Sequence, residues 1–119
     1  MENARGLLKQ ILDRELALHR ELLAIARLRH MVLRQGRVAG LYALRTAEVS
    51  RVCELRGLEA ARARLVTEPN PEVLDAAPRI AAAIRRLGAV ERANRSLLVR
   101  HVVRSRHLSE GVAIWAASA

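Results

Sequence analysis

The sequence contains 119 residues, of which 51% are hydrophobic, 28% are charged and only 2% are aromatic. It carries 21 Lys and Arg against 12 Asp and Glu, and the resulting net charge of +9 favours acidic partners at low salt. Aliphatic residues recur in phase, which excludes a disordered chain, and no charge-free apolar stretch approaches the roughly 20 residues of a membrane span. We expect one domain over residues 1–119, because two would each be too small to bury a core.

The N-terminal residues and the cysteine content both indicate the cytoplasm. Met1 to Gly6 lead directly into a charged amphipathic segment, so the sequence predicts no secretory signal. The single cysteine, Cys53, permits no internal disulfide and fits a reducing compartment. We therefore expect a cytoplasmic protein without a membrane span.

The first amphipathic segment predicts a helix from about residue 2 to residue 34. Apolar residues repeat there at spacings of three, four and seven, which is the period of one helix face. They are Leu8, Ile11, Leu18, Leu22, Ile25 and Val32. Glu15 and Arg29 interrupt this stripe, and further leucines beside it widen the apolar face. A face this broad predicts packing against two neighbouring helices.

A second helix is expected from about residue 38 to residue 66, with Gly40 and Gly57 inside it. Gly36 marks the expected turn before it, because glycine readily adopts the left-handed conformation that ends a helix. The alternative is that the first two helices fuse through Gly36 into one bent rod.

The strongest break in the pattern is the segment 67–71, Thr-Glu-Pro-Asn-Pro, because two prolines around an Asn cannot continue a helix. It predicts a loop over residues 67–77, with Asp75 as a candidate N-cap and Pro78 in the first turn of the next helix. The third helix is expected over about residues 78–116. Three long helices with short connections imply an all-α fold, an elongated antiparallel three-helix bundle or coiled coil.

No pattern in the sequence indicates an enzyme or a cofactor site. The six glycines are scattered and form no phosphate-binding loop. Glu15 and His19 are four residues apart, but without further ligands we expect no metal site, and we interpret the histidines as surface residues. Cys53 has no activating partner in the sequence and is interpreted as a buried or half-buried filler. We expect a non-enzymatic protein without cofactor or metal.

Residues 79–107 hold eight arginines and one acidic residue, Glu91. A basic helix of this kind can contact nucleic-acid phosphates. The arginines are spread around the helix, however, and no aromatic residues are interleaved with them to stack on bases. We interpret the charge as a solvated helix surface and keep a basic nucleic-acid- or scaffold-binding module as the alternative function.

The last predicted helix combines a polar residue in its apolar stripe with more apolar surface than one helix contact needs. Asn94 lies three and four residues before Leu97 and Leu98. A buried Asn at such a position fixes the register of many coiled coils, and the other interpretation is a residue that awaits a partner helix. Apolar residues continue downstream at Val102, Leu108, Val112 and Trp115. Such a face could also pair with a second copy of the chain.

Three segments of the chain carry a family resemblance. The Leu-rich first helix leads into residues 35–41, Gln-Gly-Arg-Val-Ala-Gly-Leu, and the second ends in the charged stretch 58–65. The most specific segment is residues 90–98, in which Asn94 precedes the pair Leu97-Leu98. Together they resemble the bacterial flagellar export chaperone family (FlgN-like), whose final helix contains an Asn-x-x-Leu-Leu segment.

The resemblance implies a small helical cytoplasmic chaperone that holds hook-associated flagellar proteins before type III secretion, with the export apparatus as a further partner. Such chaperones bind a helical terminal segment of the client, largely through the last helix. The resemblance assigns this role to Asn94, Leu97, Leu98, Val102, Leu108, Val112 and Trp115. The charge of +9 departs from the acidic character of the family, and it predicts a client segment with an acidic polar face.

Overall fold

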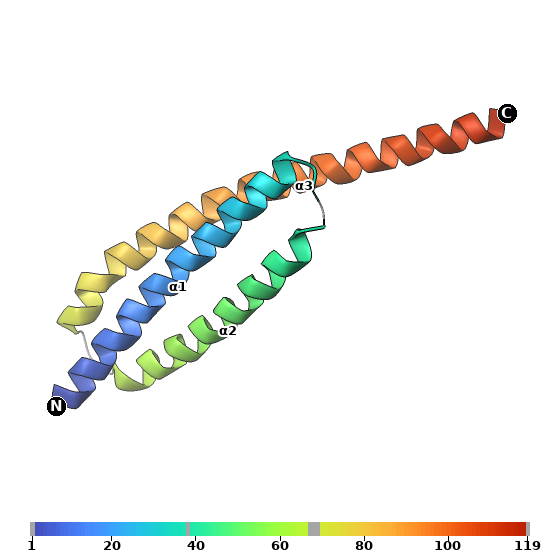
Figure 1. Cartoon of the computed structure of the whole chain (residues 1–119). Helices are drawn as coiled ribbons and strands as arrows, with labels where there is room; N and C mark the ends of the chain where they lie inside the picture. The colour runs from blue at the N-terminus through green and yellow to red at the C-terminus, as the bar shows by residue number, and fades with distance from the viewer. Residues whose placement is uncertain (1, 38, 67–69, 119) are drawn as a thin grey trace.

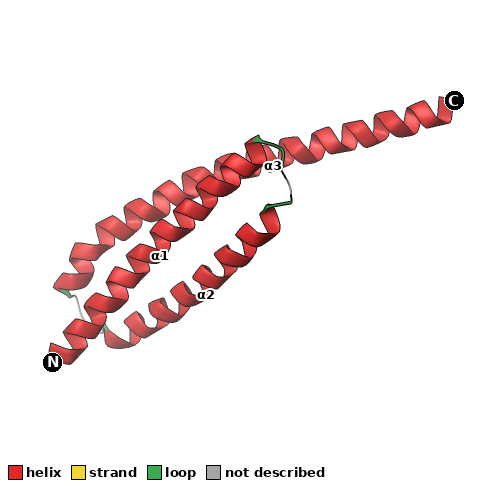
Figure 2. Ribbon diagram, in the orientation of Figure 1, coloured by secondary structure: helices red, strands yellow, loops and turns green. Residues whose placement is uncertain are grey.

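The computed structural model describes the backbone of residues 2–37, 39–66 and 70–118, and the side chains of residues 5–37, 39–66, 70–100 and 103. Three helices account for almost all of this backbone: α1 (Glu2–Arg34), α2 (Leu41–Leu65) and α3 (Pro71–Ser118). No strand occurs in these described ranges (Figure 2). The all-α fold predicted from the sequence is confirmed.

The helices form an elongated bundle in which α1 lies between the other two. α2 runs antiparallel to α1, and α3 runs in the same direction as α1 (Figure 1). Both α2 and α3 pack on α1, whereas their described backbones do not approach one another within 8 Å (Cα to Cα). The molecule measures 79 × 21 × 21 Å. The elongated three-helix bundle is therefore confirmed, with consecutive helices antiparallel and α1 as its central element.

The apolar face of α1 explains this central position. Most of the buried apolar side chains belong to α1, namely Leu8, Ile11, Leu12, Leu18, Leu22, Leu23, Ile25 and Ala26. From the other two helices only Leu55 and Ala83 are buried to the same degree among the described residues. At the centre, Leu18, Leu22 and Leu55 pack together, with Leu87 of α3 against them. The broad stripe read from the sequence thus contacts two helices, as predicted.

The turn between α1 and α2 forms at Gly36, which has a φ of 69°. The Arg37 amide donates to the Val32 carbonyl at 3.0 Å, and the Gly36 amide donates to the Leu33 carbonyl at 3.1 Å. This pair of hydrogen bonds is a Schellman motif, which satisfies the last carbonyls of a helix and reverses the chain. The fused rod is therefore wrong, and α2 begins at Leu41, three residues later than predicted, with Gly40 as its N-cap rather than inside it.

α3 begins at Pro71 rather than near Pro78, so the predicted loop over residues 67–77 is too long. The side-chain oxygen of Asn70 accepts a hydrogen bond from the Glu72 amide at 2.9 Å. An Asn N-cap followed by Pro in the first helical position is a favourable helix start, because Pro has no N–H to leave unsatisfied there. Pro78 lies inside the helix, and Asp75 pairs with Arg79 at 3.2 Å instead of capping.

α3 is much longer than its neighbours. At about 1.5 Å per residue its 48 residues extend about 72 Å, whereas the 33 residues of α1 extend about 50 Å. The two helices start at the same end of the bundle, so the C-terminal part of α3 projects beyond the α1–α2 turn (Figure 1). No other described segment lies beside this extension (Figure 1).

The core at Leu18 generates a test of the fold. Leu18 is fully buried, so Leu18→Ala should lower the free energy of unfolding by about 2–5 kcal/mol, through lost burial and the cavity left behind. Leu28→Ala is the matched control on the same helix, because Leu28 is 51% exposed. Urea denaturation followed by circular dichroism measures both. Equal losses in the two variants would contradict the central position of α1.

Candidate functional site

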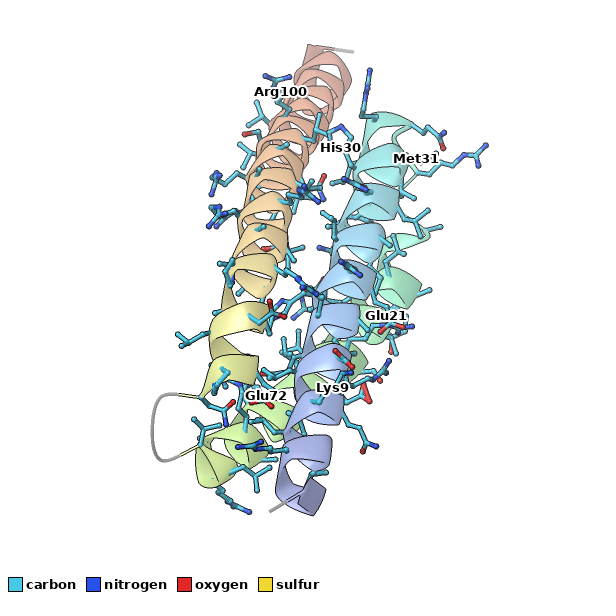
Figure 3. The ribbon with its side chains drawn as sticks, turned by 90° about the vertical axis from the view of Figure 1, so that its left-hand side faces the viewer. Lys9, Glu21, His30, Met31, Glu72 and Arg100 are labelled. Atoms are coloured by element: carbon cyan, nitrogen blue, oxygen red, sulfur yellow. The ribbon has the colours of Figure 1, made fainter. Side chains whose placement is uncertain are left out.

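Asn94 holds α3 to α1 through its carboxamide. The side chain is 3% exposed, and its Nδ2 donates to the carbonyl oxygen of Ala26 at 2.8 Å. Its Oδ1 lies 3.0 Å from Nδ1 of His30. Because a carboxamide oxygen can only accept, His30 must carry a proton on Nδ1. Figure 3 shows His30 on the side of α1 that faces α3. Asn94 is therefore buried against α1, as the first of its two interpretations predicted.

The apolar residues after Asn94 are less covered than Asn94 itself. Leu97 is half-buried, Leu98 is 43% exposed, and Val99 and Val103 are 61% and 45% exposed. The structure therefore separates the predicted site into a buried residue at 94 and an accessible apolar surface that starts at Leu98. The remaining predicted contacts lie on α3, but their side chains are outside the described residues; they are Val102, Leu108, Val112 and Trp115.

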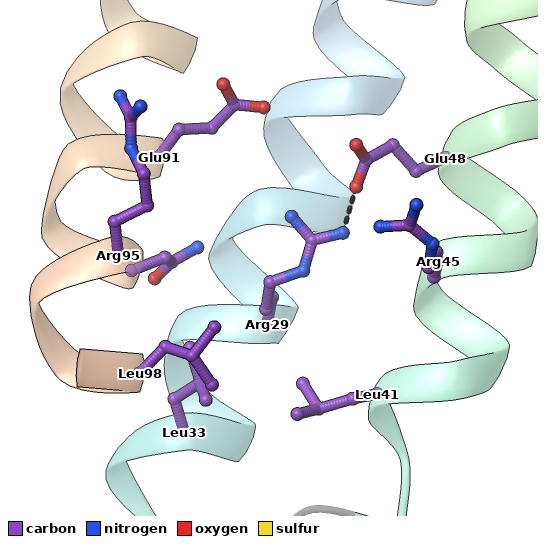
Figure 4. Close-up of a pocket in the computed structure, with 9 residues that line it drawn as sticks. Arg29, Leu33, Leu41, Arg45, Glu48, Glu91, Arg95 and Leu98 are labelled. Carbon is purple, nitrogen blue, oxygen red and sulfur yellow. Dashed lines mark hydrogen bonds and ion pairs between the residues drawn. The ribbon is translucent and has the colours of Figure 1, made fainter. Parts of the chain in front are cut away.

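An open groove of about 450 Å³ lies where α1, α2 and α3 come together near the α1–α2 turn. Its apolar part consists of Leu33 from α1, Leu41 from α2 and Leu98 from α3 (Figure 4). Charged side chains surround these leucines, and Arg29 of α1 pairs there with Glu48 of α2. The sequence pointed to Asn94 and Leu98, because the other lining residues meet these two only through the packing of three helices.

A buried polar cluster on α1 faces α2. Glu15 is 2% exposed, and its carboxylate accepts hydrogen bonds from Nε of Arg62 at 2.9 and 3.2 Å. One turn later, His19 is 6% exposed, and its Nδ1 has no hydrogen-bond partner among the described residues. The interpretation of His19 as a surface residue is therefore wrong. The interruption of the apolar stripe at Glu15 was the signal in the sequence, since only a paired carboxylate is tolerated there.

Burial also determines the charge state of His19. The pKa of His19 is lowered because the buried site disfavours the charged ring, while the carboxylates of Glu59 and Glu15 act in the opposite direction. The ring therefore favours its neutral form in the folded chain.

The position of Cys53 on α2 differs from the expectation. Cys53 is exposed on α2, so its interpretation as a buried or half-buried filler is wrong. α2 has a weak apolar period, which is why the side facing α1 could not be assigned there from the sequence.

Among the side chains that the structure describes, no group of three or more His, Cys, Asp and Glu residues is arranged to hold a metal ion. Over the same residues, no helix combines the length and apolar character needed to cross a bilayer.

No protein-family model matches the chain, and neither a curated protein nor a solved structure matches it. Any functional conclusion therefore depends on the residues themselves and on the motif resemblance.

The first prediction for the site concerns Asn94. Asn94→Ala should lower the free energy of unfolding by about 1–3 kcal/mol, because it removes one buried and one partly buried hydrogen bond and leaves His30 without its acceptor. Ser96→Ala, at an exposed position two residues later, should change it by less than about 0.5 kcal/mol. Urea denaturation compares the two. An unchanged free energy of unfolding in Asn94→Ala would show that the carboxamide does not hold the helices together.

The second prediction concerns pH. The pKa of His19 in the folded chain lies below its unfolded value of about 6.5, so the unfolded chain takes up a proton more readily than the folded one. Its contribution to stability is therefore fully present above about pH 6.5 and is lost as the pH falls through the folded pKa. The free energy of unfolding should therefore fall between pH 7 and about 5.5, before most carboxylates titrate. In His19→Leu the same titration should be flatter. If the free energy of unfolding of His19→Leu falls as steeply with pH as that of the unsubstituted chain, other groups cause the pH dependence.

Proposed function

We propose that the chain is a non-enzymatic flagellar export chaperone that acts in the cytoplasm. It holds helical terminal segments of hook-associated proteins before type III secretion and presents them to the export apparatus. The proposal combines the motif resemblance with one structural observation, the accessible apolar surface of α3 that begins at Leu98 and continues through Val99 and Val103.

The physical basis of this proposal is burial of apolar surface. Covering a large aliphatic side chain contributes about 1.5–3 kcal/mol, so several such residues at helical spacing supply affinity for an amphipathic partner helix. The extension of α3 adds a second reason. The extension is about 22 Å long, and an isolated helix of about this length is only marginally stable in water. A client helix packed alongside it would stabilise it. Val102, Leu108, Val112 and Trp115 remain the predicted contacts along that extension.

Asn94 has a different role from the apolar residues in this proposal. Its carboxamide is buried, and both its nitrogen and its oxygen already have partners on α1. We therefore assign Asn94 to holding α3 in place, so that Leu98 and the residues after it are presented to the client from a fixed position.

The test is a pull-down of the full chain with terminal helices of hook-associated proteins, at about 150 mM and about 500 mM salt. Apolar binding should survive the higher salt, and Leu98→Asp should weaken it at least about tenfold. Leu74→Asp is the matched control, because Leu74 is 67% exposed at the opposite end of the same helix. Circular dichroism confirms that both variants remain folded.

The alternative function, a basic nucleic-acid- or scaffold-binding module, predicts a different result. Binding to nucleic acid would be tight at low salt, would fall steeply as salt rises and would not depend on Leu98. Retention of nucleic acid with that salt dependence, together with no binding of any hook-associated segment, would contradict the chaperone proposal.

A further inference from the structure

The groove near the α1–α2 turn is an open gap between the three helices. In the middle of the bundle α2 and α3 close over α1, where Leu22 is 6% exposed and packs with Leu55 of α2 and Leu87 of α3. Near the α1–α2 turn they do not close over it, and the three leucines that line the groove are only partly covered. In four-helix bundles every helix packs on two neighbours, at interaxial distances of about 8–10 Å. A fourth helix laid between α2 and α3 would cover Leu33, Leu41 and Leu98 and complete this arrangement (Figure 4).

The charges that surround the groove are not balanced within the chain. Arg29 is neutralised by Glu48, but Arg45 on α2 and Arg95 on α3 form no ion pair with any residue whose side chain is described. Glu91 is the remaining acidic residue of the groove. The lining of the groove thus carries three arginines and two glutamates, and each of its two sides has one arginine without an ion pair among the described residues. An occupant with carboxylates beside its apolar stripe could pair with both of these arginines.

The wider surroundings increase this excess. Residues 23–47 contain five arginines and no acidic residue, and residues 85–109 contain seven arginines and one acidic residue. By contrast, residues 1–22 contain four basic and four acidic residues, and residues 48–84 contain five basic and six acidic ones. The net positive charge is thus confined to the half of the rod that holds the α1–α2 turn, the groove and the α3 extension.

We propose that the groove binds an amphipathic helix of a partner protein whose apolar stripe is flanked by acidic residues, as the fourth helix of the bundle. The inference deepens the proposed function, on which it rests, by naming the place and the chemistry of client recognition. A second copy of this chain is the less suitable occupant, because its own accessible helix, the extension of α3, also lies in the arginine-rich part of the sequence.

The test uses the full chain and two labelled helical peptides of about 20 residues with the same leucine stripe, one flanked by Glu and one by Lys. Fluorescence anisotropy should show that the Glu-flanked peptide binds at least about tenfold more tightly than the Lys-flanked peptide. A short single-stranded DNA oligonucleotide, which has the negative charge without the apolar stripe, should bind more weakly than the Glu-flanked peptide.

Two pairs of variants locate the binding surface. Leu41→Asp should weaken the Glu-flanked peptide at least about tenfold, whereas Tyr42→Asp, at a neighbouring position that is 82% exposed, should have little effect. Arg45→Glu should abolish the preference for the Glu-flanked peptide, whereas Arg56→Glu, exposed on the same helix but remote from the groove, should retain it. Circular dichroism of each variant controls for folding.

The outcomes separate this inference from the chaperone proposal. If hook-associated segments bind and their binding depends on Leu98 but not on Leu41 or Arg45, the groove is not the binding site, whereas the chaperone proposal is supported. If the Glu-flanked peptide binds as expected but no hook-associated segment does, the inference about the groove is supported, whereas the proposed client is contradicted. Equal affinity for the two peptides, stronger binding of the oligonucleotide, or a dimer of the chain that is lost in Leu41→Asp would overturn the inference.

Discussion

The packing of two helices on one apolar face of α1 is the interaction on which the whole molecule depends. Among the described side chains, α2 and α3 each contribute few large apolar residues to the interior, such as Leu55 and Leu87, and these pack against α1, so neither helix would be held without it. This arrangement also explains why surface is left over. α2 and α3 close over α1 at the level of Leu18 and Leu22, whereas near the α1–α2 turn the three helices leave an open groove.

The polar groups within the interface make this packing specific. A leucine-rich face alone would allow neighbouring helices to shift by a turn at little cost. Glu15 with Arg62 fixes α2 against α1, and Asn94 with the Ala26 carbonyl and His30 fixes α3 against α1. Each contact is satisfied in only one register, because a shift would bury a carboxylate or a carboxamide without its partner. The hydrogen bonds thus select the register, and apolar burial supplies most of the stability.

The sequence contains enough information for the helices and the bundle, because these follow from local and periodic signals. The stripe on α1 and the turn at Gly36 are examples, and both agree with the structure. The start of α3 was misplaced because the second proline, read as a loop residue, is the first residue of a helix capped by Asn70. The exposure of Cys53 and the groove beside Leu41 depend on how the helices rotate against one another. No spacing within a single helix contains that information.

The uneven distribution of arginine has a consequence for encounters in solution. A rod 79 Å long with its positive charge concentrated in one half is an electric dipole, and the field of an anionic body exerts a torque on it before contact. The rod would therefore rotate so that the half with the α1–α2 turn arrives first. Alignment of this kind shortens the orientational search that limits most protein associations, and added salt removes it because the field is screened.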